Sequence, residues 1–469
     1  MFELHHLSAQ EQWDWLHRGE IEPIELVEHY LERIFRLNPN LGAFVTITED
    51  AARESAKTVN RDNATRPLWG LPIADKDLQQ RKGVRTTFGS ALFKEFVPTN
   101  SDELTETLDA AGAISLGKTN TPEFGLSSYT ENAITPPTRN PYDLDLGPGG
   151  SSGGAAVAVA AGMLPFAPGS DGGGSVRIPA AATGLVGVKP SRGLLPAGSG
   201  LDKLAGLVVP GPIARSVADA AMLLDAMCGG DYEFTLRAQN VDKGAYLNSA
   251  VRGEGRFQIG VMTSSPWDFD YEIQIEADAL AAFEIAKREL DALGHGLEET
   301  RLPEQDFYAD CFRTIWKVGA GVIPVSGSEL ELLEPLTRWL IAEGRSISAV
   351  QLADALSRLT NFERSVNQQF ASFDAVLTPA LAQSPRPIGW YSQEDPELNF
   401  AQQVQYTPFT SFVNVTGLPA IVLPVHVSAT GLPMGVQLIG KPGGERALFA
   451  IGAQLERRLQ WQKRHPPQW

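Results

Sequence analysis

Two glycine-rich segments carry the serine residues that are best placed for chemistry. From Gly147 to Arg177 the chain reads GPGGSSGGAAVAVAAGMLPFAPGSDGGGSVR, with Ser151 and Ser152 in the first segment and Ser175 after three glycines in the second. Glycine lets the backbone adopt positive φ and approach a ligand closely, at an entropic cost of about 0.5–1 kcal/mol per residue. Serine hydroxyls in such turns are candidate nucleophiles, and glycine N–H groups are candidate donors to the oxyanion of acyl transfer.

A serine nucleophile needs a base, and the histidines of this chain are poorly placed to serve as one. They lie in predicted N-terminal helices, at a helix end, in a hairpin and in the tail: His5, His6, His17, His29, His295, His426 and His465. Lys76, in GLPIADKDL, follows an apolar segment that we predict to be buried. Burial lowers the pKa of a lysine, so that its neutral amine becomes able to accept a proton. Lys76 is therefore either a structural lysine paired with Asp75 or Asp77, or the base.

Other catalytic motifs have weaker support. The string GGSSGG matches G-x-S-x-G around Ser151 and Ser152, but a nucleophile elbow needs a strand directly before it, and TRNPYDLDLGP has the composition of a loop. A histidine triad assembled from distant residues stays open. The chain lacks H-E-x-x-H, clustered metal ligands, G-x-G-x-x-G and a Walker A lysine. We predict that the protein uses no metal and no cofactor.

Composition narrows the choice of partners. The chain has 469 residues and a formal net charge of −17, which opposes binding to nucleic acid or to an anionic membrane. The two cysteines, Cys228 and Cys311, have no metal-ligand spacing and suit a reducing compartment. The N-terminus does not resemble a signal peptide, and no apolar run is long enough to span a bilayer. We expect a cytoplasmic protein with no nucleic-acid or membrane partner.

The elements that must position these side chains alternate between helix and strand. Such alternation predicts an α/β protein built around a large mixed central β-sheet with helices on both faces. We predict helices over 8–17, 23–36, 49–59, 101–111, 272–292 and 445–459, a buried helix in the small-residue run after Ser152, strands over 67–73, 113–120 and 257–262, and an antiparallel hairpin from AIVLPVHV and MGVQLIG. We expect a single domain over 1–469, with an N-terminal helical layer over 1–60 and a catalytic-motif region over 61–200.

Four separated motifs resemble the amidase signature family of serine hydrolases. GGSSGGAAVAVAAG followed by GSDGGGSVRIPAAATGLVGVKPSRG resembles the family signature, and LPIADKDL resembles its catalytic-lysine motif. GKTNTPEFGLSSYTEN and the closing GLPAIVLPVHVSATGLPMGVQLIG resemble its connecting and C-terminal blocks. The resemblance covers most of residues 25–465 in order, and it is close to the aryl and alkyl amidases and the nylon-oligomer hydrolases.

This resemblance implies a role for each chemical group. Ser175 would attack the amide carbonyl, Ser151 would follow a cis peptide bond and relay the proton, and Lys76 would be the base. Gly125, Gly172, Gly173 and Gly174 would line the site through their main chain, the last three as oxyanion donors. Ser152 would support Ser151, and Asp171 and Arg177 would form a buried pair that locks the loop.

Two positions depart from the commonest family pattern. Gly172 stands where many members have threonine, which would widen the mouth of the oxyanion loop. Asp75 stands before Lys76 where an apolar residue is usual, and a carboxylate aimed at Lys76 would raise the pKa of the lysine. Neighbouring side chains of a strand point to opposite faces, so we expect Asp75 to point away.

The sequence thus predicts a serine amidase that hydrolyses a carboxamide through an acyl-enzyme, acts on a small-molecule amide and is a monomer or homodimer. Ester and carbamate hydrolysis would be side activities. The region 305–410 is expected to supply part of the substrate pocket through the aromatic residues Phe307, Tyr308, Trp316, Trp339, Trp390 and Tyr391. The alternatives are the glutaminase subunit of a tRNA-dependent amidotransferase and a non-catalytic binding protein of the same fold.

Overall fold

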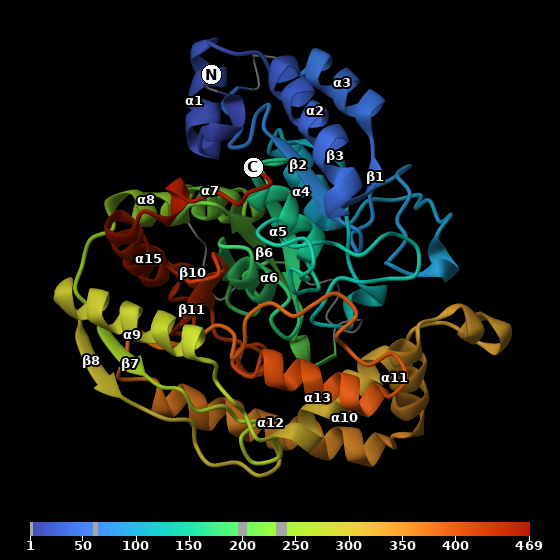
Figure 1. Ribbon diagram of the computed structural model, residues 1–469, viewed down its shortest axis with the longest axis vertical. Coiled ribbons are helices and arrows are strands. Elements are labelled where there is room, and N and C mark those ends of the chain that lie inside the picture. Colours follow the sequence, from blue (N-terminus) through green and yellow to red (C-terminus); the bar gives the residue numbers. More distant parts are fainter. Residues whose placement is uncertain (1–2, 60–63, 196–203, 231–241) are drawn as a thin grey trace.

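The computed structural model describes residues 3–59, 64–195, 204–230 and 242–469, and these form two β-sheets (Figure 1). The smaller sheet has the order β1-β3-β2, with bounds Phe44–Ile47, Ile114–Thr119 and Pro72–Lys76. The larger sheet has eight strands in the order β4 (Phe166–Asp171), β6 (Val209–Ala214), β5 (Val186–Lys189), β10 (Ala420–Val427), β11 (Pro433–Gly440), β9 (Ala375–Pro379), β7 (Gln258–Val261) and β8 (Gly296–Glu299).

The larger sheet is mixed, as the alternation of elements predicts. The strands from β4 to β9 pair in antiparallel fashion, whereas β9, β7 and β8 run parallel. The predicted hairpin is present, because β10 and β11 are antiparallel neighbours with Ala420 opposite Ile439. The prediction of an α/β fold with a mixed central sheet is therefore confirmed.

Helices cover both faces of this sheet. The described helices are α1 (Ala9–Arg18), α2 (Pro23–Leu41), α3 (Glu49–Thr58), α4 (Glu103–Ala110), α5 (Gly153–Ala160), α6 (Arg177–Ala182), α7 (Val217–Met227), α8 (Ala245–Arg252), α9 (Ala277–Ala292), α10 (Tyr308–Gly321), α11 (Pro335–Ser346), α12 (Ala349–Gln369), α13 (Pro396–Tyr406), α14 (Ser411–Val415) and α15 (Glu445–Leu459). Alternate residues of β10 serve the two faces. Ile421 and Leu423 pack in the core with α7, α9 and α15, whereas Val422 packs with Ile178 of α6.

The buried helix α5 lies between the two sheets and contacts strands of both. All eight of its residues are buried, and they are glycine, alanine or valine. A Cβ atom on Gly154 would lie 2.3 Å from the backbone nitrogen of Asn120, so only glycine allows the start of α5 to come this close to the chain after β3. This approach places Ser151, two residues before α5, beside Lys76 at the end of β2.

Several predicted boundaries move in the structure. The strand predicted over 67–73 begins at Pro72 and continues to Lys76, because the residues before it form turns and Gly70 has a φ of +77°. The second helix continues past Arg36 to Leu41 and contains Pro39, and the helix predicted from Glu272 begins at Ala277. The helix over 445–459 has the predicted bounds.

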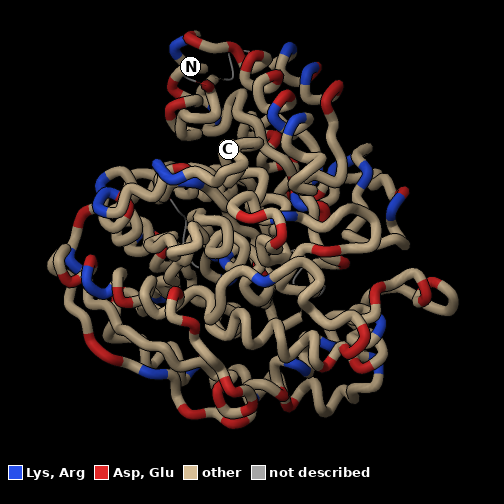
Figure 2. The backbone as a smooth tube through the Cα atoms, in the orientation of Figure 1, with Lys and Arg blue, Asp and Glu red and all other residues tan. Residues whose placement is uncertain are grey.

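The N-terminal helices pack onto the rest of the chain. One hydrophobic cluster runs from Ala9 to Trp461 and includes residues of both sheets. In Figure 1 these helices form the upper part of the molecule, near the C-terminus. Trp469 there lies beside Arg33 of α2, with 5.8 Å between the guanidinium carbon and the ring centre. The backbone positions of acidic and basic residues lie mostly toward the outside of the molecule (Figure 2).

The close approach of β5 and β6 yields a stability prediction. A Cβ atom on Gly211 of β6 would lie 2.0 Å from the carbonyl oxygen of Val188, whereas one on Gly319 of α10 would meet no atom within 4 Å. We expect Gly211→Ala to lower the free energy of unfolding by about 1–3 kcal/mol, because a backbone oxygen must move. Gly319→Ala should leave it unchanged or raise it by up to about 1 kcal/mol. Urea unfolding midpoints compare the two, and equal midpoints would contradict the argument.

Candidate active site

Lys76 is the last residue of β2 and is completely buried at the junction of the two sheets. Its Nζ lies 2.8 Å from Ser151 Oγ and 3.0 Å from Ser170 Oγ, and it donates to the Ser170 carbonyl at 3.3 Å. Ser170 belongs to β4, so the lysine amine joins three segments that are far apart in the sequence. These polar neighbours are neutral, so among the described residues the ammonium form has no directly bonded counterion.

The pKa of Lys76 follows from this environment. Burial lowers it to about 7, while the negative charge of Asp171 acts in the opposite direction. Asp75 points away as expected, because its carboxylate accepts from Arg81 Nε at 2.7 Å. Asp77 accepts from the backbone N–H of Thr87 at 3.0 Å. The structural pairing of Lys76 with either aspartate is therefore excluded.

Ser151 and Ser152 take different positions at the start of α5. The Gly150–Ser151 peptide bond is cis, as the family resemblance implies, and Ser151 is 2% exposed. Ser152 donates its backbone N–H to the Ser175 carbonyl at 3.0 Å, and its hydroxyl bonds the main chain of Ser170. The predicted support of Ser151 by the Ser152 hydroxyl is not seen, because that hydroxyl ties β4 to α5 instead.

A buried ion pair encloses the loop that carries Ser175. Asp171 Oδ1 accepts from Arg177 Nη2 and from the Gly174 N–H, both at 2.8 Å. Asp171 Oδ2 accepts from Arg177 Nε at 3.0 Å and from the Val176 N–H at 3.1 Å. Burial alone would raise the pKa of Asp171, but the charge and hydrogen bonds of Arg177, followed by Asn414, hold it well below its ordinary range. The loop between β4 and α6 is therefore tied at both ends and in its middle.

The glycines of this loop differ in what they offer. The Gly174 N–H already donates to Asp171, so its predicted part as an oxyanion donor is corrected to a shaping one. Gly174 has a φ of +132°, and a Cβ there would lie 2.4 Å from Thr410 Oγ1. Within the described residues the N–H groups of Gly172 and Gly173 have no protein acceptor. The Gly173 carbonyl is held by Thr410 Oγ1 at 2.6 Å.

Gly125 lies against the serine next to Lys76. Its φ is +69°, and a Cβ atom would approach Ser151 Oγ to 3.2 Å and the Leu78 side chain to 2.6 Å. Any larger residue would therefore press on Ser151 and on Leu78. The contribution of Gly125 is space beside the Ser151 hydroxyl.

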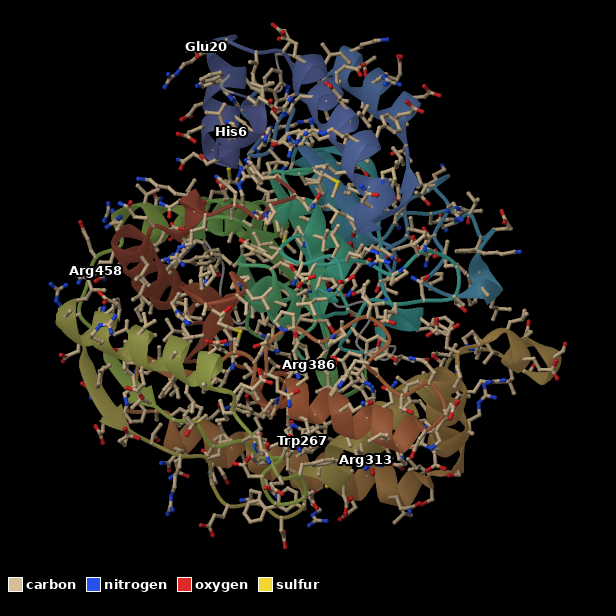
Figure 3. The ribbon with its side chains drawn as sticks, viewed as in Figure 1. His6, Glu20, Trp267, Arg313, Arg386 and Arg458 are labelled. Carbon is tan, nitrogen blue, oxygen red and sulfur yellow. The ribbon has the colours of Figure 1, made fainter. Side chains whose placement is uncertain are left out.

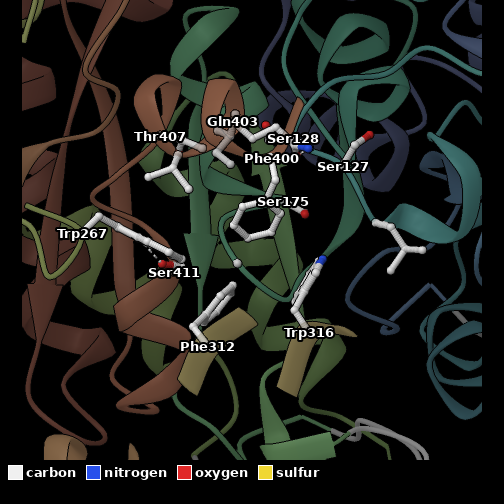
Figure 4. Close-up of a pocket in the computed structure, with 14 residues that line it drawn as sticks. Ser127, Ser128, Ser175, Trp267, Phe312, Trp316, Phe400, Gln403, Thr407 and Ser411 are labelled. Atoms are coloured by element: carbon white, nitrogen blue, oxygen red, sulfur yellow. Dashed lines mark hydrogen bonds between the residues drawn. The ribbon is translucent and has the colours of Figure 1, made fainter. Parts of the chain in front are cut away.

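Two cavities meet at Ser175. The larger, of about 520 Å³, is also lined by Ser151, Ser170 and Gly172. The smaller, of about 70 Å³, lies on the other side of Ser175, and four of its fourteen lining residues are aromatic (Figure 4). Trp267, one of these, lies on the same side of the molecule as Arg313 of α10 (Figure 3).

Of the aromatic residues proposed for the pocket from the region 305–410, Trp316 lines both cavities. The others do not occur in either lining and pack elsewhere. Tyr308 bonds Ser411 beside the smaller cavity, Trp339 faces Lys317, and Tyr391 stacks on Tyr129. Trp267, outside the predicted region, lines the smaller cavity and was missed because its position depends on the packing of α10 and α13.

Four further residues make hydrogen bonds that fix the geometry of the site, and the sequence did not predict these contacts. Ser170 bonds Lys76, and Thr410 bonds the Gly173 carbonyl. Arg177 Nη1 donates to Gln437 Oε1 and Arg177 Nη2 to Asn414 Oδ1, both at 2.6 Å. A glutamine in the middle of the apolar strand MGVQLIG is the one signal that could have indicated a buried polar contact.

A single group of metal-capable side chains occurs in the part of the chain that the structure describes: Glu3, His5 and His29. His5 Nδ1 lies 3.0 Å from His29 Nε2, and Arg33 lies 3.7 Å from the carboxylate of Glu3. The nearby guanidinium opposes a bound cation. This group belongs to the N-terminal helices and not to the cavities at Ser175.

None of the described helices combines the length and the apolar character that a membrane-spanning helix needs.

The fold and the site together define a hydrolase of amide bonds, and comparison with known proteins identifies the family. The amidase family model matches residues 25–449. A putative amidase, AmiB2, of Mycobacterium tuberculosis is 36% identical over 98% of this chain and 97% of its own. A subunit of the glutamyl-tRNA(Gln) amidotransferase of Roseiflexus is 32% identical over 99% of this chain and 98% of its own.

Solved structures agree with this result. The structure of a 6-aminohexanoate cyclic dimer hydrolase complexed with substrate has a TM-score of 0.90 and 29% identity, covering 99% of this chain and 100% of that one. A bacterial aryl acylamidase has a TM-score of 0.85 and 27% identity, with 98% and 97% covered. The chain belongs to the amidase signature family and is an amidohydrolase that cleaves amide C–N bonds.

The buried pair predicts a large stability difference between two similar substitutions. Asp171→Asn leaves Arg177 buried with reduced charge compensation, and we expect a loss of about 3–5 kcal/mol in the free energy of unfolding. Glu284→Gln, in a surface pair whose Nζ–O distance to Lys287 is 3.1 Å, should change it by less than about 0.5 kcal/mol. Urea unfolding followed by tryptophan fluorescence measures both, and a similar small effect of the two would disprove the locking role of Asp171.

Proposed function

We propose that this amidase works through an acyl-enzyme on Ser175, with Ser151 as proton relay and Lys76 as base. Ser175 Oγ forms a bond to the amide carbonyl carbon while its proton passes through Ser151 to the neutral amine of Lys76. The C–N bond then breaks, Ser151 gives its proton to the departing nitrogen, and Lys76 returns a proton to Ser151. Water repeats the sequence on the ester and releases the carboxylic acid and Ser175.

The observation that carries the proposal is the 2.8 Å contact between Lys76 Nζ and Ser151 Oγ inside a buried site. A lysine with a pKa of about 7 and no directly paired carboxylate among the described residues is partly neutral at physiological pH. Ser151 and Ser175 line the same cavity. The described residues show no hydrogen bond between these two hydroxyls, and such catalytic contacts commonly tighten only when substrate is bound.

The oxyanion would be held by the main chain of the Ser175 loop. The N–H groups of Gly172 and Gly173 have no acceptor within the described part of the chain, and the two glycines lie three and two residues before the nucleophile. Preorganised donors of this kind are typically worth about 2.7–4 kcal/mol each in the transition state. The Asp171–Arg177 pair keeps the loop from rearranging as charge develops.

The main alternative is the glutaminase activity of an amidotransferase, to one subunit of which the chain is also similar. Glutamine carries an α-carboxylate and an α-ammonium group, and burying either needs a partner of opposite charge. The described residues that line the two cavities include Asp102 and Glu103 in the larger one but no lysine or arginine. The cavities therefore favour an amide without an α-carboxylate.

Substitution of the nucleophile tests the central step. We expect Ser175→Ala to lower kcat/KM by at least about 1,000-fold on any amide that the native enzyme cleaves, because no other group forms the acyl-enzyme. It should also abolish labelling by a fluorophosphonate. Ser55→Ala, on the exposed face of α3, is the control and should keep both properties. Full turnover or labelling in Ser175→Ala would refute the assignment, and rapid glutamine hydrolysis would favour the amidotransferase alternative.

The pH profile tests the base. Because Lys76 must be neutral to accept a proton and its pKa is about 7, kcat/KM should rise with pH through about 7 and level off above it. Burial also lowers the pKa of Lys189 to about 7, and its Nζ donates to the Pro190 carbonyl at 2.9 Å. Lys189→Met is thus a matched control.

The Lys189→Met variant should keep the same ascending limb, whereas Lys76→Met should lose activity at every pH. A profile for the native enzyme that is flat from about pH 5.5 to 9, or a limb that disappears in Lys189→Met, would rule out Lys76 as the titrating base.

A further inference from the structure

The two cavities are not equivalent with respect to the proton relay, and this difference gives each of them a place in the reaction. Ser151 lines the larger cavity and is absent from the lining of the smaller one. Leu126, Ser175 and Trp316 line both and form the boundary between them. In the mechanism proposed above, Ser151 protonates the departing nitrogen, so this nitrogen must face the Ser151 side. The acyl half of the substrate then extends to the other side of Ser175.

Four aromatic side chains line the cavity on that other side, which we call the aromatic cavity. Trp267 meets Phe312 edge-on, with 5.4 Å between the ring centres and 77° between the planes. Phe312 stacks on Trp316 at 5.6 Å and 15°. Phe400 closes the wall opposite, as Figure 4 shows. Rings in this arrangement offer both faces and edges to an apolar or flat group.

Several polar groups of the smaller cavity already bond within the protein, whereas the buried Ser128 hydroxyl has no hydrogen-bond partner among the described residues. Ser411 Oγ accepts from Trp267 Nε1 at 3.0 Å, and Gln403 Oε1 accepts from the Ser128 N–H at 2.7 Å. Thr407 Oγ1 lies 2.9 Å from Thr410 Oγ1. None of the described residues that line this cavity is charged. A charged acyl group would therefore lose its hydration without gaining a partner of opposite charge among these residues.

The larger cavity has a different character. Its lining includes the carboxylates Asp102 and Glu103 and the amide of Gln79 besides apolar residues, and its volume of about 520 Å³ compares with about 70 Å³ for the smaller. A polar, even cationic, group on the amine half would keep favourable neighbours here.

We propose that the aromatic cavity is the acyl pocket and that the preferred substrates are amides of uncharged aromatic or apolar carboxylic acids, with the amine half in the larger cavity. This inference rests on the proposed function, because the relay through Ser151 sets the direction of the amide. Phe312 of α10 is its principal specificity-determining residue, since it lines the aromatic cavity and packs 3.8 Å from the Cβ position of Gly173.

Matched substrates test which cavity takes the acyl half of the amide and whether a charge on that half is disfavoured. With 4-nitroaniline as the common amine, the acyl groups pentanoyl, 5-aminopentanoyl and glutaryl differ in remote charge and little in length. We expect kcat/KM for pentanoyl to exceed that for each charged acyl group at least about 100-fold. With benzoyl as the common acyl group, butylamine and 1,4-diaminobutane as amines should differ by less than about tenfold.

Two variants assign the pockets to the halves of the substrate. Phe312→Leu should lower the benzoyl-to-pentanoyl ratio of kcat/KM by about tenfold and leave the amine ranking unchanged. Ile323→Ala, in the larger cavity, should leave the acyl ranking unchanged. Fluorophosphonate labelling shows that each variant keeps a folded site.

Each result has one meaning. Equal turnover of charged and uncharged acyl groups, or a change of amine ranking in Phe312→Leu, would overturn the assignment of the acyl pocket while Ser175 is still labelled. If the native enzyme is neither labelled by the fluorophosphonate nor able to hydrolyse any of these amides, the proposed function is refuted, and with it this inference.

Discussion

The buried ion pair of Asp171 and Arg177 is the interaction on which the rest of the site depends. Both side chains are completely buried, and between them they reach β4, the Ser175 loop, α6, α14 and β11. A buried pair is not by itself a large source of stability, because both charges lose their hydration. Its value here is geometric. Each of its hydrogen bonds removes one way in which the glycine-rich loop could rearrange.

Asp171 of this pair also acts on Lys76, in the direction opposite to burial. Asp171 is the one charged group among the described residues whose field raises the pKa of this lysine, and Arg177 lies between 2.8 and 3.0 Å from its carboxylate. Burial has the larger effect and lowers the pKa of Lys76 to about 7 in spite of Asp171. The pair thus shapes the loop of the nucleophile, while burial at the junction of the two sheets favours the neutral form of the base.

The sequence predicts the candidate catalytic residues better than the residues that line the cavities around them. Lys76, Ser151 and Ser175 lie in segments where local composition is unusual, so that glycine density and a lysine after an apolar run were visible without the structure. The contact between Lys76 and Ser170 could not be predicted from the sequence, because it arises from the packing of two separate sheets on α5. Element types were mostly correct, whereas the strand before Lys76 began later than predicted, since turns with positive φ precede it.

The cavity walls show why substrate preference is harder to derive. Trp267, Phe312 and Phe400 come from a loop, α10 and α13, and nothing in their local sequence distinguishes them from core residues such as Tyr308. Only the packing of α10 against the glycine loop turns Phe312 and Trp316 toward Ser175. A Cβ on Gly172 would lie 3.0 Å from Val208 and 3.6 Å from the Trp316 ring, so the glycine that departs from the family pattern is the one against which Trp316 closes. A side chain at this position would press first on Val208, while the Trp316 ring would stay at ordinary contact distance. The boundary between the two cavities therefore depends on the packing of Trp316 beside a loop position where Val208 leaves little room for a larger residue.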